Sequence, residues 1–311
     1  MTTFLVALAA VGVLLISAVP GYVLLKKKMI GEACIPGLSK ILLYACQPCL
    51  AVYTFQTIEW SGELGLRMLT FAGAALLLQA MILGGAYLIL HKKCKEAIYR
   101  IVVIGMGLAN CAFFGIPIIE ALIPEVAREV LVYTTVYSFV MNILGWTVCS
   151  AIIANDVKYM RPKNIVFNPA MIGTAVALLL CVLGIRLPTE LSSMVTSFGK
   201  CCTPLSMMIM GMRLATVNFR SMLGDARVYL TLAVKQFAMP IIAFLLLLLL
   251  PMGVPEKQTL FIIAACPAAS IVLNFSEIVG QGQKEAASIV LLSTITSIIS
   301  IPIVMLLLPL I

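Results

Sequence analysis

The sequence predicts an all-α polytopic membrane protein with ten transmembrane helices arranged as two inverted five-helix repeats. Three observations lead to this prediction. Of the 311 residues, 62% are hydrophobic and only 11% are charged, whereas about a quarter of the residues in a soluble domain are charged. Apolar runs of about 20 residues, the length at which a helix crosses a bilayer, recur along the whole chain. The two halves of the chain also carry similar landmarks at matching positions.

The apolar runs are separated by short polar connections that leave no room for a soluble domain. The first run lacks a preceding basic stretch and is followed by Lys26, Lys27 and Lys28, the reverse of a signal peptide. We therefore expect it to be retained as a helix. The expected spans are residues 4–25, 38–58, 66–90, 101–123, 130–154, 166–185, 190–212, 228–250, 258–279 and 286–310.

Lysine and arginine are distributed unevenly between the two sets of connections. Most follow odd-numbered spans, as in Lys26–Lys28 and the group Lys92, Lys93 and Lys95, and few lie in the other set. The positive-inside rule assigns the basic side to the cytoplasm. We therefore expect both chain ends outside and a multi-pass protein of the plasma membrane. The formal charge of +8 then reflects topology and does not indicate nucleic-acid binding.

Shifting the sequence by half its length aligns Cys46-Gln47-Pro48 with Cys202-Thr203-Pro204 and brings Asn110 within one residue of Pro267. Each half holds five spans, an odd number, so the second half must enter the membrane in the opposite orientation. Such inverted repeats are typical of secondary transporters. The predicted divisions are a first repeat at residues 1–154, a cytoplasmic linker at 155–165 and a second repeat at 166–311.

Spans four and nine are poor candidates for unbroken helices. Span four contains Gly105, Asn110 and Pro117, and span nine contains Pro267 near its middle. In hydrocarbon, a broken helix is tolerated only where it is buried in protein or lines a wet cavity. We expect the two spans to break and cross, with Ala109, Asn110, Pro117 and Pro267 at the crossing. Their N-terminal half-helix ends would then suit an anion. Two ordinary proline kinks are the alternative.

Two lysines lie inside expected spans, although a charge within the membrane is costly. Lys200 precedes Pro204 in span seven, and Lys235 lies in span eight. No carboxylate lies deep in any span to pair with them, so both would suit an anionic substrate. The alternative for Lys235 is an extended side chain that reaches the cytoplasmic headgroups.

The sequence shows no motif for a metal, a cofactor or a nucleotide. The ten cysteines have no zinc or redox spacing, and there is no phosphate-binding loop. Transport would therefore be secondary. In span five, Tyr137 and Asn142 could both approach a central cavity.

Several motifs together resemble the auxin efflux carrier family, in its bacterial branch. The resemblance covers essentially the whole chain, and its most specific part is the last 50 residues. The motifs are Ala265–Ser270, Ala286–Ser297, Ile301-Pro302, Gly199–Leu205 followed by Gly211, Asn110 with Gly115–Pro117, and Asn168-Pro169.

The resemblance implies that spans one, two, six and seven form a scaffold that usually dimerises. Spans three to five and eight to ten would form a transport domain that moves as an elevator, with an anionic substrate beside the crossing. Ala109-Asn110 stands where plant members have Pro-Asn. Bacterial relatives are associated with malate, malonate and similar carboxylates, so auxin is not transferred as the substrate.

We therefore expect a carrier of small organic carboxylate anions. Lys235 would balance the anion's charge. One rival is a sodium-coupled symporter of the bile-acid type, which needs oxygen-rich sodium sites at the crossing. Another is a membrane sensor that binds without transporting. The residues expected to bind substrate are Asn110, Cys111, Pro267, Ala268, Ala269, Ser270, Gln47, Thr203, Lys200, Tyr137 and Asn142.

Overall fold

A computed structural model describes residues 2–156, 158, 168–217 and 222–311. Most of the predicted linker at 155–165 and the first two residues of the sixth expected span lie outside the described residues. The described helices, in chain order, are α1 (Thr2–Lys26), α2 (Cys34–Ile41), η1 (Leu42–Cys46), α3 (Gln47–Gln56), α4 (Gly62–Leu90), η2 (His91–Lys93), α5 (Ala97–Gly107), η3 (Cys111–Gly115), α6 (Ile116–Leu122), η4 (Pro124–Val126), α7 (Ala127–Leu144), η5 (Gly145–Cys149), α8 (Ser150–Ala154), α10 (Pro169–Val182), α11 (Thr189–Lys200), α12 (Cys202–Thr216), α14 (Ala226–Ala233), η7 (Val234–Ala238), α15 (Met239–Leu249), α16 (Val254–Ala265), α17 (Ile271–Val279), α18 (Gln283–Val304) and η8 (Met305–Leu310).

The structure confirms the predicted all-α class, because the described residues contain helices and connections and no strand beyond one isolated bridge. Within the described residues, six helical stretches are long and apolar enough to cross a membrane, which indicates a multi-pass membrane protein. They are Thr2–Lys26, Cys34–Gln56, Gly62–Lys93, Glu129–Ala154, Ala226–Leu249 and Gln283–Leu310. Three shorter apolar helices are Ala97–Gly107, Cys111–Leu122 and Pro169–Val182.

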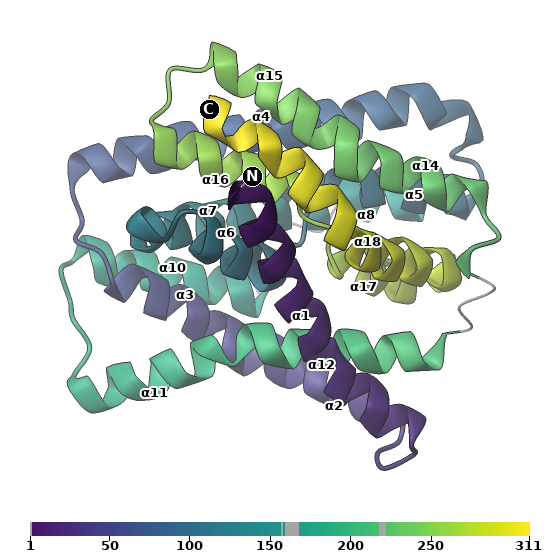
Figure 1. Ribbon diagram of the computed structural model, residues 1–311, viewed down its shortest axis with the longest axis horizontal. Helices are drawn as coiled ribbons and strands as arrows, with labels where there is room; N and C mark the ends of the chain where they lie inside the picture. The colour runs from purple at the N-terminus through teal and green to yellow at the C-terminus, as the bar shows by residue number, and fades with distance from the viewer. Residues whose placement is uncertain (1, 157, 159–167, 218–221) are drawn as a thin grey trace.

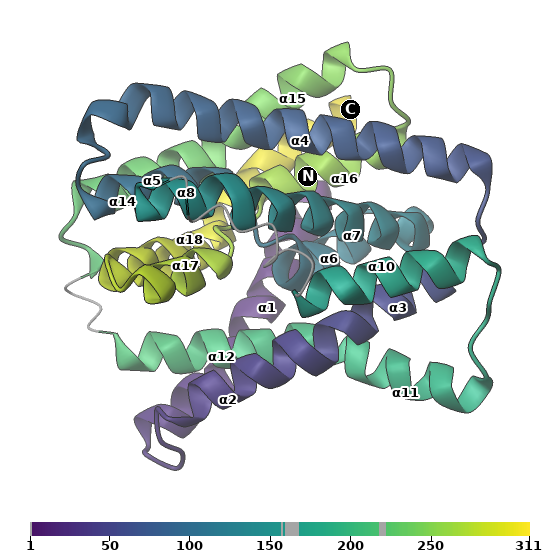
Figure 2. The same ribbon diagram turned by 180° about the vertical axis from the view of Figure 1, so that it is seen from behind.

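The helices form two groups, which Figures 1 and 2 show one above the other. The lower group consists of α2, η1, α3, α10, α11 and α12, in which α10 and α11 pack on α3. The upper group consists of the described helices from α4 to α8 and from α14 to α18. α1 packs along α12 and also against α18, so it joins the groups.

Glycines allow close helix contacts within the lower group and between that group and α1. A Cβ atom at Gly211 of α12 would collide with the main chain of Ala18 in α1, and one at Gly21 would collide with the main chain of Met208. A Cβ atom at Gly173 of α10 would similarly collide with Pro48 of α3. Small residues of this kind are typical of helix contacts in membranes, where close backbone approach replaces the hydrophobic driving force.

In the described part of the chain, four wide, π-helical turns interrupt the long helices, and three of them are followed closely by a proline. The wide turns are η1, η3, η5 and η7, and Pro48, Pro117 and Pro240 follow η1, η3 and η7. Proline removes one main-chain donor and its ring crowds the carbonyl of the preceding turn. A locally wider turn relieves this crowding while the helix continues.

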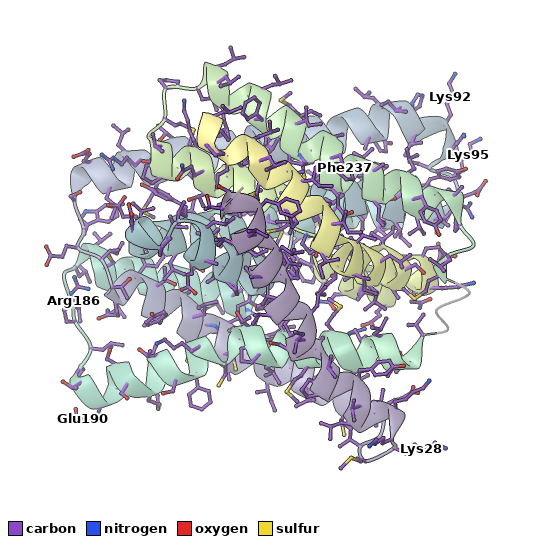
Figure 3. All side chains as sticks on the ribbon, viewed as in Figure 1. Lys28, Lys92, Lys95, Arg186, Glu190 and Phe237 are labelled. Atoms are coloured by element: carbon purple, nitrogen blue, oxygen red, sulfur yellow. The ribbon has the colours of Figure 1, made fainter. Side chains whose placement is uncertain are left out.

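Charged residues gather at the two ends of the helices. In Figure 3, Lys28, Lys92 and Lys95 lie at one end of the molecule, and Arg186 and Glu190 lie at the opposite end. The helices between them present many exposed apolar side chains, such as Leu88, Ile89 and Leu249. An apolar belt between two charged ends matches a protein embedded in a bilayer.

Candidate functional site

Two helices end in the middle of the upper group, at the two positions where the sequence predicted breaks. α5 ends at Gly107, Leu108 is extended with φ −100° and ψ 122°, and a new helical segment begins at Cys111. α16 ends at Ala265, and Cys266 is extended with φ −62° and ψ 152°. Cys266 precedes Pro267, and proline disfavours a helical conformation in the residue before it.

The two breaks hold each other through main-chain atoms. Ala109 and Ala268 face each other in an antiparallel bridge. The Asn110 amide donates to the Pro267 carbonyl at 2.9 Å, and the Ala269 amide donates to the Leu108 carbonyl at 3.0 Å. Each break therefore supplies the hydrogen-bond partners that the other lost, as a buried, unwound segment requires.

Side chains from neighbouring helices complete this pairing. The Ala268 amide donates to the hydroxyl of Ser293 in α18 at 3.1 Å. The Lys235 ammonium in η7 donates to the Ala264 carbonyl at 2.9 Å, in the last turn of α16. Lys235 is 0% exposed, so it does not extend to the headgroups, which was one of the two interpretations of its sequence position.

A cavity of about 510 Å³ lies beside the breaks, between the two helix groups. This volume falls in the range of small-molecule sites. Its lining comes from η1 and α3, the first residues of α10, both breaks, α7, η5 and α17. The lining residues are Leu43, Tyr44, Gln47, Ala109, Asn110, Cys111, Ala112, Phe113, Ser138, Met141, Asn142, Trp146, Asn168, Pro169, Ala269, Ser270, Ile271 and Asn274.

The cavity wall carries buried polar atoms that have no partner among the described residues. They are Nδ2 of Asn110, Nε1 of Trp146 and Oε1 of Gln47. The amides of Ala112, Phe113, Ser270 and Ile271 stand at the starts of the two half-helices, where the first amides have no acceptor within the helix. Most of these groups are donors, and a buried donor without an acceptor costs about 1–3 kcal/mol. The wall therefore favours a ligand rich in acceptors.

The polar side chains that line this cavity are neutral. None of the described lining residues is charged. Asn168 caps α10, because its Oδ1 accepts from the Ala170 amide at 2.9 Å. Its Nδ2 donates to Oδ1 of Asn142 at 3.2 Å, and Asn142 in turn donates to the Ser138 carbonyl at 2.8 Å. This chain of amides connects α7 to α10 across the cavity wall.

The structure brings only part of the predicted substrate site to this cavity. Asn110, Cys111, Ala269, Ser270, Gln47 and Asn142 line it. Pro267 and Ala268 form the break behind it, and Tyr137 is fully buried with a hydroxyl that has no partner in the described part of the chain. Thr203 and Lys200 lie elsewhere in the lower group, where Lys200 is exposed and stands over the Tyr53 ring at 5.8 Å. Among the predicted crossing residues, Pro117 lies within α6.

Sequence reasoning missed several of the lining residues. Tyr44 and Trp146 sit on the wide turns η1 and η5, whose presence redirects side chains in a way that simple helical spacing does not predict. Asn168 belongs to one of the motifs of the family resemblance, and in the structure it is both the cap of α10 and a lining residue. Asn274 follows Ser270 by one helical turn in a span already expected to break, so this spacing could have identified it.

A family model described as membrane transport protein, that of the auxin efflux carriers, matches residues 5–165 and again residues 155–305. The chain belongs to the auxin efflux carrier family. The resemblance found in the sequence motifs is thereby confirmed. A comparison with curated proteins finds no match. Auxin efflux carrier proteins are membrane transporters and not enzymes, so this protein is a membrane transporter of a small molecule.

Proposed function

We propose that this protein is a secondary carrier of small organic carboxylate anions. The observation that carries the proposal is the set of unpartnered donors on the cavity wall, led by Asn110 Nδ2 and Trp146 Nε1. A carboxylate has two acceptor oxygens and no donor when ionised. It would satisfy several of these groups at once, which water or an amine would do less completely.

An anion can bind here without a cationic side chain in the wall. The two half-helices that begin at Cys111 and Ile271 direct the positive ends of their dipoles toward the breaks. Free amides at such ends bind carboxylate and phosphate groups in many proteins. The apolar part of the substrate would contact Leu43, Met141 and Ile271, which line the same space.

The position of the cavity supports an elevator mechanism. Its wall combines η1, α3 and α10 of the lower group with the breaks, α7 and α17 of the upper group. In this proposal the lower group with α1 is the scaffold and the upper group is the transport domain. A sliding movement of the upper group would carry both breaks, and the bound anion, along Gln47 and Tyr44. The scaffold is also where a second copy would dimerise.

The proposed topology has ten crossings in two inverted repeats. α5 with α6, and α16 with α17, each form one crossing that is broken in the middle, and α11 with α12 forms another. The basic end that carries Lys28, Lys92 and Lys95 would face the cytoplasm, so both chain ends would lie outside. The matches of one family model to two successive segments support this division.

The decisive experiment is thermal unfolding of the purified protein with acetate, malonate, malate and benzoate. We expect at least one of these acids to raise the melting temperature. Trp146→Phe keeps an aromatic ring but removes the indole N–H together with the ring that carries it, and Asn110→Asp replaces a donor by a carboxylate of the same shape. A lost hydrogen bond to a charged ligand costs about 1.5–3 kcal/mol. Trp146→Phe should therefore weaken binding about tenfold or more, and Asn110→Asp should abolish the shift.

Gln283→Ala is the matched control, because Gln283 is an exposed residue at the start of α18. It should bind like the wild type. Unchanged binding in both cavity variants would remove the cavity as the site. Binding and uptake that both require sodium, and fail in choline, would favour the sodium-coupled alternative. Binding without any uptake into liposomes would instead favour a sensor.

A further inference from the structure

Lys235 is a buried lysine that has no carboxylate partner among the residues that the structure describes. Its side chain is 0% exposed, and its Nζ contacts the Ala264 carbonyl at 2.9 Å and the Met239 sulfur at 3.3 Å. None of the ion pairs found among the described residues includes it. Lysines inside membranes normally pair with an acid, line water or mark a pathway for ions or protons, so this position calls for a functional explanation.

The position of Lys235 relates it to the cavity on the other side of the breaks. Ala264 lies at the carbonyl end of α16, where the helix carries partial negative charge. Lys235 does not line the cavity, but the end of α16 that it contacts leads directly into the break, whose Ala269 and Ser270 do line it. The paired breaks therefore have Lys235 on one face and the candidate anion site on the other.

The groups that surround Lys235 supply little permanent charge. η7 packs against α5, α14, α15, α16 and α18. From these elements and from η3, the titratable side chains that interact with Lys235 are the thiols of Cys266 and Cys111, and Tyr137 interacts with the same two thiols. Burial disfavours a lone charge, whereas a nearby opposite charge favours it. Few local charges therefore stabilise the protonated form of Lys235, and an anion bound in the neighbouring cavity would favour that form.

We infer that Lys235 is a proton-binding site of the carrier, which takes up a proton when a carboxylate anion enters the cavity and releases it when the anion leaves. The lone pair of the neutral amine accepts the proton, which comes from water on the side where the anion enters. Linkage is reciprocal, so the proton strengthens anion binding as much as the anion strengthens protonation. The inference rests on the proposed function and makes the protein an anion and proton symporter.

Calorimetry with malonate and malate as probes tests the inference directly. Binding is measured in buffers of different ionisation enthalpy, and the slope gives the protons taken up per bound anion. For the wild type, the number of protons taken up per bound anion should rise toward about one at alkaline pH. In that pH range its affinity for the probe should fall by at most about tenfold per pH unit. Lys235→Arg keeps a permanent charge, because arginine does not deprotonate in proteins. It should bind the probe with no proton uptake and no pH dependence.

Lys235→Met keeps the length of the side chain without its charge, and it provides a second test if arginine does not fit. It should bind at least tenfold more weakly and take up no proton. Lys284→Met is the control, because Lys284 is exposed at the start of α18 and should leave both measurements unchanged. Probe binding by the wild type without proton uptake, or equal uptake by the Lys235 variants, overturns the inference alone. If no acid binds the wild type, the proposed function fails, and this inference fails with it.

Discussion

Arg100 is a second buried cation in the upper group, and its surroundings show how a single residue can organise three connections. Its guanidinium donates to the carbonyls of Ile153, Cys94 and Lys95 and to Oε1 of Gln281. These acceptors come from the end of α8, the connection before α5 and the turn before α18. Unlike Lys235, it is therefore surrounded by oxygen acceptors, which matches the fixed fork of donors in arginine.

We predict that Arg100→Ala strongly destabilises the protein without changing the cavity. The substitution leaves the buried carbonyls of Ile153 and Cys94 without their donor, and each such loss costs about 1–3 kcal/mol. The melting temperature should fall by several degrees even in the presence of a bound carboxylate. The exposed Lys92→Ala serves as the control at the same end of the molecule (Figure 3). An Arg100→Ala protein as stable as the wild type would contradict this account.

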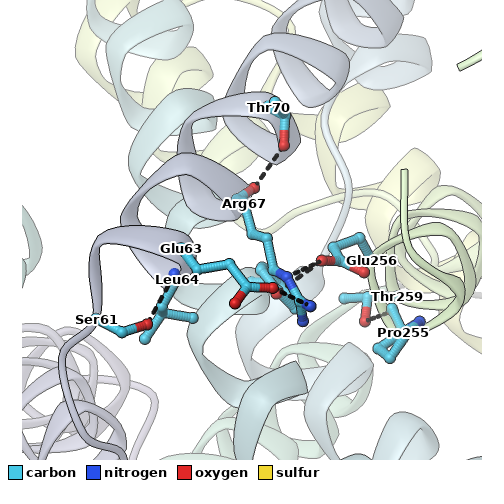
Figure 4. Close-up of polar contacts among 9 residues, drawn as sticks. Ser61, Glu63, Leu64, Arg67, Thr70, Pro255, Glu256 and Thr259 are labelled. Atoms are coloured by element: carbon cyan, nitrogen blue, oxygen red, sulfur yellow. Dashed lines mark hydrogen bonds and ion pairs between the residues drawn. The ribbon is translucent and has the colours of Figure 1, made fainter. Parts of the chain in front are cut away.

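A polar cluster around Glu256 fixes the start of α16, at the other end of this helix from Lys235. Glu256 is 2% exposed, accepts from the Tyr133 hydroxyl at 3.0 Å and lies 3.8 Å from Nε of Arg67. Arg67 also pairs with Glu63 one turn earlier in α4 (Figure 4). The carboxylate stands in the first turn of α16, where the helix dipole favours a negative charge. This cluster joins α4, α7 and α16 at one end of the upper group.

At the scale of elements, the lower group depends on glycine at the points where helices touch. We predict that Gly173→Leu prevents α10 from packing on α3, because its Cβ would collide with the main chain of Pro48, which cannot move as a side chain can. The purified variant should aggregate or unfold at a much lower temperature than the wild type.

Gly12→Leu is the matched control for this prediction. Nothing lies within 4 Å of a Cβ atom added at Gly12 of α1, and the larger side chain would point into lipid or detergent. Its melting temperature should stay close to that of the wild type, since leucine is also the better helix former. A similar loss of stability in both variants would show that close packing is not the reason for the glycine at position 173.

The elements also show how far sequence reasoning reaches. The breaks could be predicted, because Pro267 and the run of Gly105, Asn110 and Pro117 disfavour a helix by local chemistry alone. The cavity wall was predicted only in part. Lys200 was expected to line it and lies exposed on α11, since the direction of a side chain depends on how the whole helix packs. Trp146 lies on the wide turn η5, and no proline in or just after this turn indicates it in the sequence.

At the scale of the whole molecule, the proposed orientation gives a direct labelling test. Lys92 and Glu190 lie at opposite ends of the helices (Figure 3). With the exposed native thiols of Cys34 and Cys201 removed, a maleimide that cannot cross membranes should label Glu190→Cys from outside intact cells. It should label Lys92→Cys only after the cells are opened. The reverse pattern would place the basic end outside and invert the proposed topology.

The pairing of the two breaks has a consequence for how such a carrier can diversify. The bonds between Asn110 and Pro267, and between Ala269 and Leu108, use only main-chain atoms. The side chains at Cys111, Ser270 and Asn274 are therefore not needed to hold the breaks together, and substitution there leaves the architecture intact. Descendants of one ancestral chain can thus acquire new substrates through single substitutions around an unchanged main-chain pairing. Shared ancestry in such proteins therefore says more about how they move than about which substrate they carry.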